Sequence, residues 1–525
     1  MTLPRLRGAS LVLPLALSAL LAVSACFIVR TVTVSEVDGR ADSVQVRSPV
    51  KAHLLDGTTV VYRNGVLIRR GRLTGQGTRY DLTLGNPAAV TDLPLDSVVG
   101  LESFRSSVDA GATVGVSLLA TAAAVGATVA IACAIDPKCF GSCPTYYSDS
   151  AGTPVLEAEG FSYSIAPLFE SRDVDRLRAR PDSTGVLRLE VRNEAFETHY
   201  INHLELLEVS HATDELVAPD PWNHPLAIGR PGPPVGARDR GGRSVADLLA
   251  DAEGRTYATD SSVLAGVTEQ DLEDWVELTF DAPATEDSIA LLLRLRNSLL
   301  NTVLLYDLML GDPGARSLDW QAEELAKVGP ALELGTWYAA RMGLAVEVWR
   351  EGVWSTVARL KDTGPVAWKD VAVPLPRVPG TEMRIRLRFP ADNWRIDRAG
   401  LAPHIRRPEI RSVPLAGVSG LGGAPETRAL ASLVASDARY LETSAGQAFL
   451  ARWDVGGGTA GVERTFLLAS QGYYIEWVRR GWIAASRDTT TFRPNDSTLL
   501  RAIVRWREVQ DTLEPRFFAT RVPVR

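Results

Sequence analysis

The chain has few of the residues that carry metal and redox chemistry. Its 525 residues include only four cysteines, six histidines and four methionines. A structural zinc site needs about four ligands close together, and no histidine lies near Cys133, Cys139 and Cys143. The sequence also lacks an HExxH motif, a Gly-x-Ser-x-Gly elbow and a phosphate-binding glycine loop. We therefore expect no metal and no cofactor, and no motif identifies a catalytic residue.

The chain also lacks an excess of positive charge. It has 56 basic and 63 acidic residues, which gives a net charge of −7. No run of basic residues is interleaved with aromatic ones, as a nucleic-acid-binding surface would require. We therefore expect no nucleic-acid partner.

The first 26 residues have the pattern of an export signal. Arg5 and Arg7 precede an uncharged run rich in leucine and alanine, which ends in Val23-Ser24-Ala25-Cys26. These residues resemble a bacterial lipoprotein signal, and the resemblance implies cleavage before Cys26 and lipidation of its thiol. The alternative is an uncleaved anchor helix with an ordinary Cys26. The absence of aspartate after Cys26 favours the outer membrane or the periplasmic face of the cell envelope.

A second apolar segment lies at residues 110–135, and it carries no charge. Its length is sufficient to cross about 30 Å of hydrocarbon as a helix. It is rich in alanine, glycine and threonine, so its insertion would be only modestly favourable. Three interpretations stay open: a transmembrane helix, a helix buried in the protein, and a hairpin that adheres to the membrane. If Cys26 is lipidated outside the inner membrane, a single crossing would place residues 136–525 in the cytoplasm.

Cys139 and Cys143 are separated by three residues in the string KCFGSCPTYY. In an exported protein this spacing is compatible with a disulfide between them, and Cys133 is an alternative partner. The other interpretation is that these thiols are free.

The pattern of apolar residues predicts a mainly β fold. Apolar and polar residues alternate around Leu189, Leu278, Leu293 and Ile385, which is typical of strands with one buried face. Asn64-Gly65 and Gly352 lie between apolar runs and predict hairpin turns. The predicted fold is a small N-terminal β unit, one apolar helix and then β-sandwich or jelly-roll-like domains. The predicted divisions are a signal peptide at 1–25, a small β domain at 26–109, the apolar helix at 110–135, a β domain at 136–228, a sandwich at 244–405 and a C-terminal β domain at 426–525.

Three strings are similar to patterns found in other proteins. RNEAFETHYINHLELLEV and RTFLLASQGYYIEWVRRGW resemble segments of uncharacterised secreted bacterial proteins, and no function accompanies that resemblance. The string that begins at Trp368 and contains Trp394 looks like the edge of a carbohydrate-binding-type jelly roll.

The twelve tryptophans give the strongest indication of a ligand. Aromatic rings stack on sugar faces, so we consider Trp349, Trp354, Trp368 and Trp394 as glycan-stacking residues, although the same rings also fill sandwich cores. His199 and His203 are four residues apart and share a face. On a strand they lie about 13 Å apart, which is too far for one metal ion.

These observations favour a lipid-anchored, exported protein with a binding or scaffolding role at the cell envelope and without enzymatic activity. One alternative is an exported glycan-binding or glycan-active protein. Another is a component of a membrane complex that assembles through residues 110–135. In each case the membrane is a partner, through the lipid and through that segment, and a protein or a glycan is a further candidate partner.

The variant Cys26→Ala tests the lipid anchor. We expect the wild-type protein in the membrane fraction and labelled by a fatty acid, and the variant unlabelled and shifted to the soluble fraction, because the acyl chains provide the anchor. Fractionation of cells with a C-terminal tag measures this. An unlabelled wild-type protein, or a variant that stays in the membrane, would contradict the prediction.

Overall fold

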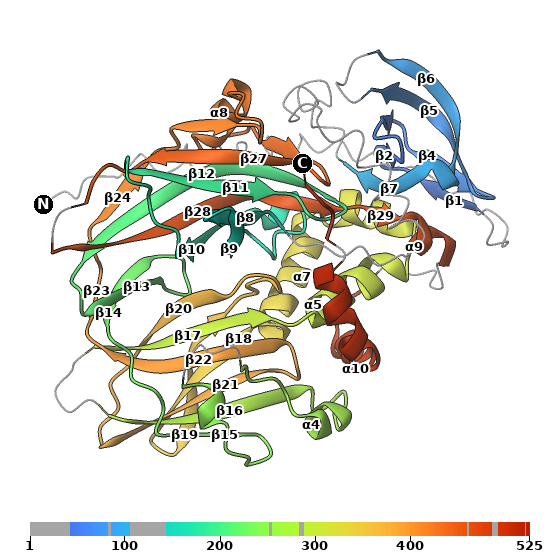
Figure 1. The fold of residues 1–525 in the computed structure, drawn as a ribbon. Helices are drawn as coiled ribbons and strands as arrows, with labels where there is room; N and C mark the ends of the chain where they lie inside the picture. Colours follow the sequence, from blue (N-terminus) through green and yellow to red (C-terminus); the bar gives the residue numbers. More distant parts are fainter. Residues whose placement is uncertain are drawn as a thin grey trace, which may run out of the picture. The chain divides into compact units, whose positions relative to one another are not determined.

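The computed structural model describes residues 43–81, 86–104, 143–250, 255–282, 288–458, 461–485, 492–519 and 521–524. Residues 43–525 form one compact unit. The predictions about Cys26, Cys133, Cys139 and residues 110–135 lie outside the described residues. The described part is mainly β and built from antiparallel sheets, as the sequence predicts (Figure 1).

Five of the sheets are stacked as layers, each named here after one of its strands. The strands of the β11 sheet are β25 (Gly417–Ser419), β27 (Ala448–Asp454), β11 (Val186–Arg192), β8 (Thr145–Ser150) and β9 (Thr153–Glu159). Those of the β12 sheet are β10 (Ser171–Arg176), β28 (Glu463–Glu476), β12 (Glu197–His211) and β24 (Ile410–Val413), with β26 (Leu441–Thr443) beside β12. The β14 sheet has β13 (Glu215–Pro219), β14 (Pro225–Gly229) and β23 (Ile405–Arg406).

The remaining two layers share one core as a β-sandwich, and their strands come from residues 236–403. The β17 sheet contains β20 (Lys369–Leu375), β17 (Ile289–Asn297) and β22 (Trp394–Pro403). The β21 sheet contains β15 (Gly236–Asp239), β16 (Glu273–Asp281), β21 (Glu382–Pro390), β18 (Leu344–Arg350) and β19 (Val353–Leu360).

The inner layers are buried on both faces. In β17, Leu291 and Leu293 pack into the core against the β21 sheet, whereas Ala290 and Leu292 belong to the core against the β14 sheet. In β28, Phe466 packs toward the β11 sheet and its neighbour Leu467 packs toward the β14 sheet. Because alternate side chains point to opposite faces of a strand, a run of consecutive apolar residues is needed for a layer with protein on both sides. Our expectation that the second face of β17 is exposed to solvent was therefore wrong.

Among the described residues, the strands of the C-terminal region form no sheet of their own. Strands β27 and β28 pair with β11 and β12. The domain boundary predicted at residue 426 therefore falls within sheets to which residues 145–211 also contribute strands.

The N-terminal β unit is one eight-stranded sheet, here called the β2 sheet. Its strands are β1 (Ser43–Val46), β4 (Val66–Arg69), β5 (Arg72–Tyr80), β3 (Thr59–Tyr62), β2 (Val50–Leu54), β7 (Val98–Ser103) and β29 (Val478–Arg479), with β6 (Ala88–Pro94) beside β5. The short strand β29, which directly follows β28, joins this sheet to the rest of the unit.

The predicted hairpin turns had different outcomes. Glu351 and Gly352, both with positive φ, form the two-residue turn between β18 and β19, which confirms the prediction. Asn64-Gly65 does not close a hairpin, because β3 and β4 both pair with β5 and not with each other. The tight turn lies instead at Arg70 and Gly71, which have φ of 49° and 69°.

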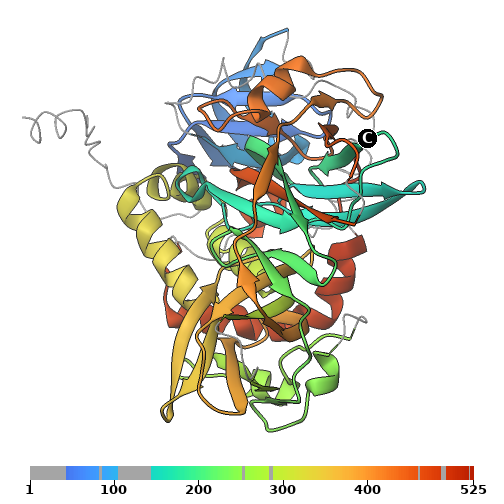
Figure 2. The same cartoon turned by 90° about the vertical axis from the view of Figure 1, so that its left-hand side faces the viewer.

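Helices are more numerous than the single apolar helix that we predicted. They are α4 (Ser261–Ala265), α5 (Leu300–Val303), η5 (Leu304–Gly311), α6 (Arg316–Asp319), η6 (Trp320–Glu324), α7 (Val328–Arg341), α8 (Thr427–Leu433), α9 (Arg480–Ala485) and α10 (Asp496–Ala519), with short turns η1 (Leu95–Ser97), η3 (Pro167–Phe169) and η4 (Ala246–Leu248). Leu499, Ile503, Trp506 and Phe517 of α10 share a core with α5, η5 and α7. Figure 2 shows the helices of residues 300–341 in yellow and α10 in red. No helix in the described ranges is long and apolar enough to cross a membrane.

Candidate functional site

A cavity of about 260 Å³ lies where the helical core meets the ends of the β12 sheet. Cys143, Ser162, Glu197 of β12 and Tyr474 of β28 contribute to its lining from the sheet side. Helices α5, η5 and α7, the segment 163–169, Gly343 and the loop 361–365 after β19 supply the rest. Segments far apart in the sequence therefore build this cavity.

Most of the cavity wall is apolar. The residues that form this wall are Ile165, Phe169, Leu305, Tyr306, Met309, Leu334 and Ala339. Polar groups gather at one pole, where Asp362, Asn301 and Tyr338 meet. An apolar wall with a few convergent polar groups is the usual composition of a small-molecule site.

Asp362 is held at this pole by three donors. Its carboxylate accepts hydrogen bonds from Tyr338 Oη at 2.6 Å, from Asn301 Nδ2 at 2.6 Å and from the Gly364 backbone N–H at 2.8 Å. Burial raises the pKa of Asp362 and outweighs the opposite effect of these hydrogen bonds. Gly364 has φ of +81°, and a Cβ there would lie 2.4 Å from the Glu159 carboxyl carbon, so only glycine fits the turn that presents Asp362.

Asn301 has a free acceptor in the cavity lining. Its side chain donates to Asp362, whereas Oδ1 is buried and has no hydrogen-bond partner. The residue is 9% exposed. A buried amide oxygen without a partner is unfavourable, so a donor on a bound molecule would be gained if the side chain turned this oxygen toward the cavity.

Glu197 is the second acid of the cavity and belongs to a buried chain of titratable groups. It lies opposite Glu476 on the paired strand, and the two carboxyl groups form a hydrogen bond. His199 Nε2 lies 2.6 Å from Glu197 Oε1, and Arg479 Nη2 donates to Glu476 Oε1 at 2.7 Å. Two carboxyl groups in contact require a shared proton.

Burial dominates the titration of this chain. It raises the pKa of Glu197 to about 7 and that of Glu476 to about 8, although the positive charge of Arg479 opposes both shifts. Burial also lowers the pKa of His199 to about 3, so this ring is neutral at physiological pH. Glu159, behind the loop of Asp362, has a pKa raised to about 8 by burial. The acidic side of the cavity therefore holds protons near neutral pH.

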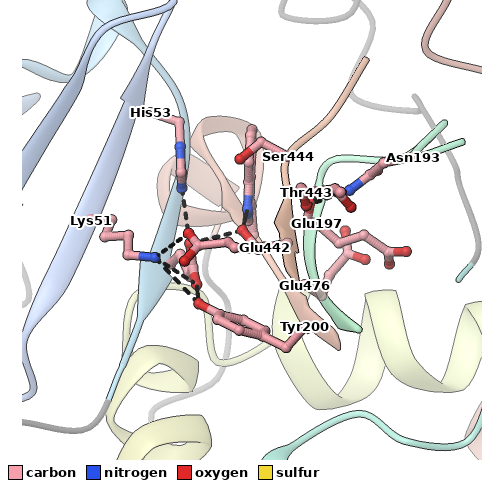
Figure 3. A network of polar contacts seen from close by, with 12 residues as sticks. Lys51, His53, Asn193, Glu197, Tyr200, Glu442, Thr443, Ser444 and Glu476 are labelled. Atoms are coloured by element: carbon pink, nitrogen blue, oxygen red, sulfur yellow. Dashed lines mark hydrogen bonds and ion pairs between the residues drawn. The ribbon is translucent and has the colours of Figure 1, made fainter. Parts of the chain in front are cut away.

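A second buried network, between the β2 and β12 sheets, places a lysine beside its acids. Figure 3 shows Lys51 and His53 directed toward the acidic group that includes Glu442. Lys51 Nζ lies 2.7 Å from Glu442 Oε1 and 3.6 Å from Glu102 Oε1. His53 Nε2 lies 3.0 Å from Glu102 Oε2. Burial alone would raise the pKa of Glu102, but the charge of Lys51 and the contacts with His53 lower it to about 2.

The structure separates the four tryptophans that we considered for glycan stacking. Trp394 is 0% exposed and its indole N–H donates to the Met342 carbonyl, so neither ring face is available. Trp349 and Trp354 form a partly exposed cross-strand pair, with ring centroids 5.1 Å apart, on β18 and β19. Trp368 is partly buried beneath the Arg296 guanidinium, 5.1 Å from its ring centroid. They do not form one site.

The structure also places the cysteines and histidines that the sequence analysis considered for a disulfide or a metal site. Cys143 is buried in the cavity lining, and its predicted disulfide partner Cys139 lies outside the described residues, as does Cys26. His203 is partly exposed, after an irregularity in β12 that separates it from His199. In the part of the chain that the structure describes, no three His, Cys, Asp or Glu side chains are grouped to hold a metal ion.

Sequence reasoning missed Asp362, Asn301 and Tyr338. Asp362 follows a strand in the string LKDTGP, and Asn301 lies in an apolar run, so no motif marks either residue. The Asp-Thr-Gly turn after a strand was the only local signal. The pole forms because side chains of α5 and α7 meet the loop after β19, and those contacts are tertiary.

Comparisons with known proteins do not identify a family. No family model and no curated protein matches the chain. A GH31 alpha-xylosidase from Xanthomonas citri is similar over 83% of this chain and 38% of its own, at 10% identity and a TM-score of 0.16. An allantoicase is similar over 52% of this chain and 92% of its own, at 11% identity and a TM-score of 0.18. A cycloalternan-forming enzyme from Listeria monocytogenes is similar over 70% of this chain and 30% of its own, at 11% identity and a TM-score of 0.17.

The chain spans 38% of the length of the xylosidase. At these TM-scores the likeness carries no argument about activity, and the function has to be argued from the cavity.

The buried acids predict that stability decreases as pH rises from about 6.5 to 8. In this interval the folded carboxyls of Glu197 and Glu476 retain protons that the unfolded chain, with pKa values near 4.5, has released. Below about 6.5, His199 opposes this trend, because the unfolded chain then protonates a ring that the folded chain keeps neutral. Glu476→Gln should reduce the slope of unfolding free energy against pH by up to about 1.4 kcal/mol per unit.

Denaturant titrations at several pH values between 6.5 and 8 measure this slope. Asp182→Asn is the matched control, because hydrogen bonds from Thr184 and Arg188 hold the pKa of this exposed carboxyl below its usual range. Its titration therefore does not affect this interval. If Glu476→Gln keeps the wild-type slope, the assignment of the raised pKa to this pair is wrong.

Proposed function

We propose that the chain is a lipid-anchored, exported protein of the cell envelope and that its cavity binds a small amphipathic molecule. The observation that supports binding is the combination of an apolar wall with a polar pole formed by Asp362, Asn301 and Tyr338. The volume of about 260 Å³ is just below the roughly 300–1,000 Å³ of small-molecule sites, so the ligand is small. The export signal that ends at Cys26 supports the location.

The unpaired Asn301 Oδ1 indicates that the ligand carries a hydrogen-bond donor. A ligand that donates a hydrogen bond there would remove the penalty of an unsatisfied buried oxygen, which is about 1–3 kcal/mol. Asp362 is already positioned by three donors, so it needs no rearrangement to accept a further bond. Binding is therefore favoured by a pole that exists before the ligand arrives.

A glycan-active enzyme is the second candidate. Glu197 and Asp362 are two acids with raised pKa values in one cavity, and a glycosidase needs a carboxyl that stays protonated to act as general acid. The largely apolar wall argues against a sugar, whose hydroxyl groups need many polar partners. A screen of chromogenic glycosides tests this candidate, and turnover that Glu197→Gln abolishes would favour it over simple binding.

The variant Ala339→Phe tests binding in the cavity. Ala339 lies on α7 and lines the cavity, so a phenyl ring there occupies space that a ligand needs. We expect a neutral, apolar fluorescent probe to bind the wild-type protein and the variant to bind it at least about tenfold more weakly, which corresponds to about 1.4 kcal/mol.

Ala431→Phe is the matched control, because Ala431 is an exposed alanine on α8, outside the cavity lining. It should leave probe binding unchanged, and thermal melts establish that both variants fold. A wild-type protein that binds no probe, or equal binding by Ala339→Phe, would contradict the proposal.

A further inference from the structure

An apolar groove adjoins the cavity along α7. The groove and the cavity share Phe169, Gly335 and Ala339 in their linings. The outer part of the groove is formed by Leu168, Val328 and Leu332, whose exposed fractions are 46%, 72% and 66%. Val328 and Leu332 are one helical turn apart, so they lie on the same face of α7. Large exposed apolar side chains that gather in this way mark a surface that binds something.

The polar groups of the cavity lining that remain available are mostly acceptors, because the Tyr338 and Tyr474 hydroxyls already donate to Asp362 and to the Ser162 carbonyl. Asp362 and Glu197 contribute carboxyl groups, and Asn301 contributes a free carbonyl oxygen. The cationic side chains of the described linings are both exposed: Arg359 in the groove and Lys361 in the cavity. The Lys361 ammonium lies 3.5 Å from Tyr163 Oη and 5.1 Å from the centroid of that ring. The pole therefore complements a positively charged group with several N–H donors.

We infer that the cavity and groove together bind a long-chain amine, with its ammonium group at Asp362 and Asn301 and its hydrocarbon chain along α7 past Leu332. This inference rests on the proposed function and names its ligand class. The helix rises about 16 Å from Val328 to Ala339, so only an extended chain reaches from the groove to the cavity. The apolar chain covers Val328 and Leu332, and the ammonium supplies the donor that Asn301 Oδ1 lacks.

The same geometry favours an amine over other ligands that carry a long hydrocarbon chain. A fatty acid would bury its carboxylate beside Asp362 and Glu197, where the lining has no buried cation to pair with it. A long-chain alcohol has one donor and no charge, so it gains less from two acids and an amide oxygen than an ammonium with three donors. The order of affinity expected for equal chain lengths is therefore amine, then alcohol, then fatty acid.

The test is displacement of the neutral fluorescent probe from the full chain by dodecylamine, dodecanol and dodecanoate, each below its micelle-forming concentration. We expect dodecylamine to bind at least tenfold more tightly than the other two. This comparison needs no variant, so a folding defect cannot obscure it. Equal affinities, or tightest binding of dodecanoate, would overturn the inference but leave the proposed function standing, because a ligand still binds. No binding of the probe or of any chain would overturn both.

Two variants locate the two ends of the amine. Asp362→Asn should weaken dodecylamine at least tenfold and change dodecanol little, whereas Asp182→Asn, at an exposed carboxyl, should change neither. Leu332→Asp should weaken dodecylamine much more than hexylamine, and Leu421→Asp, at another exposed leucine, should have no effect. The placement of the chain in the groove would be overturned if Leu332→Asp bound dodecylamine with wild-type affinity. It would also be overturned if the protein bound anionic lipid vesicles and not monomeric amine.

Discussion

The antiparallel pairing of β12 with β28 is the constraint on which the rest of the structure depends. It joins residues 197–211 to residues 463–476 along almost the full length of both strands. Because both strands are buried on two faces, they form one layer that supports the β11 sheet on one side and the β14 sheet on the other. The end of the pair brings Glu197 against Glu476 at the cavity, and the following residues enter the β2 sheet as β29.

The protein uses buried acids in two different ways. Around Glu102, the charge of Lys51 and hydrogen-bond contacts with His53 and Tyr200 keep the acid ionised, and this network holds two sheets together. A buried ion pair of this kind is costly to break, although it does not by itself stabilise the fold. Around Glu197, the acids outnumber the nearby cation Arg479, so a proton takes the place of a second cation. The protonation of the acids beside the cavity therefore changes with pH near neutrality, whereas the ion pair between Lys51 and Glu102 stays charged.

Sequence periodicity predicted the strands of the sandwich well, and it predicted the site poorly. The alternation around Leu278 and Ile385 corresponds to β16 and β21, each with one face outside the core. The run around Leu292 was misjudged because periodicity cannot tell how many layers cover a strand. The helix α10 was missed although Leu499, Ile503 and Trp506 follow a helical spacing. The pole at Asp362 was beyond prediction, since it arises only when a loop, two helices and two strand ends meet.

The most direct test of this account is a crystal structure of the protein grown with dodecylamine. The account predicts electron density for the amine inside the cavity, with its nitrogen within hydrogen-bonding distance of Asp362 and Asn301 Oδ1. The density of its chain should continue past Ala339 to Leu332. A cavity filled by the protein's own side chains, or an amine bound elsewhere on the molecule, would contradict the central claim that this pole and groove form one binding site.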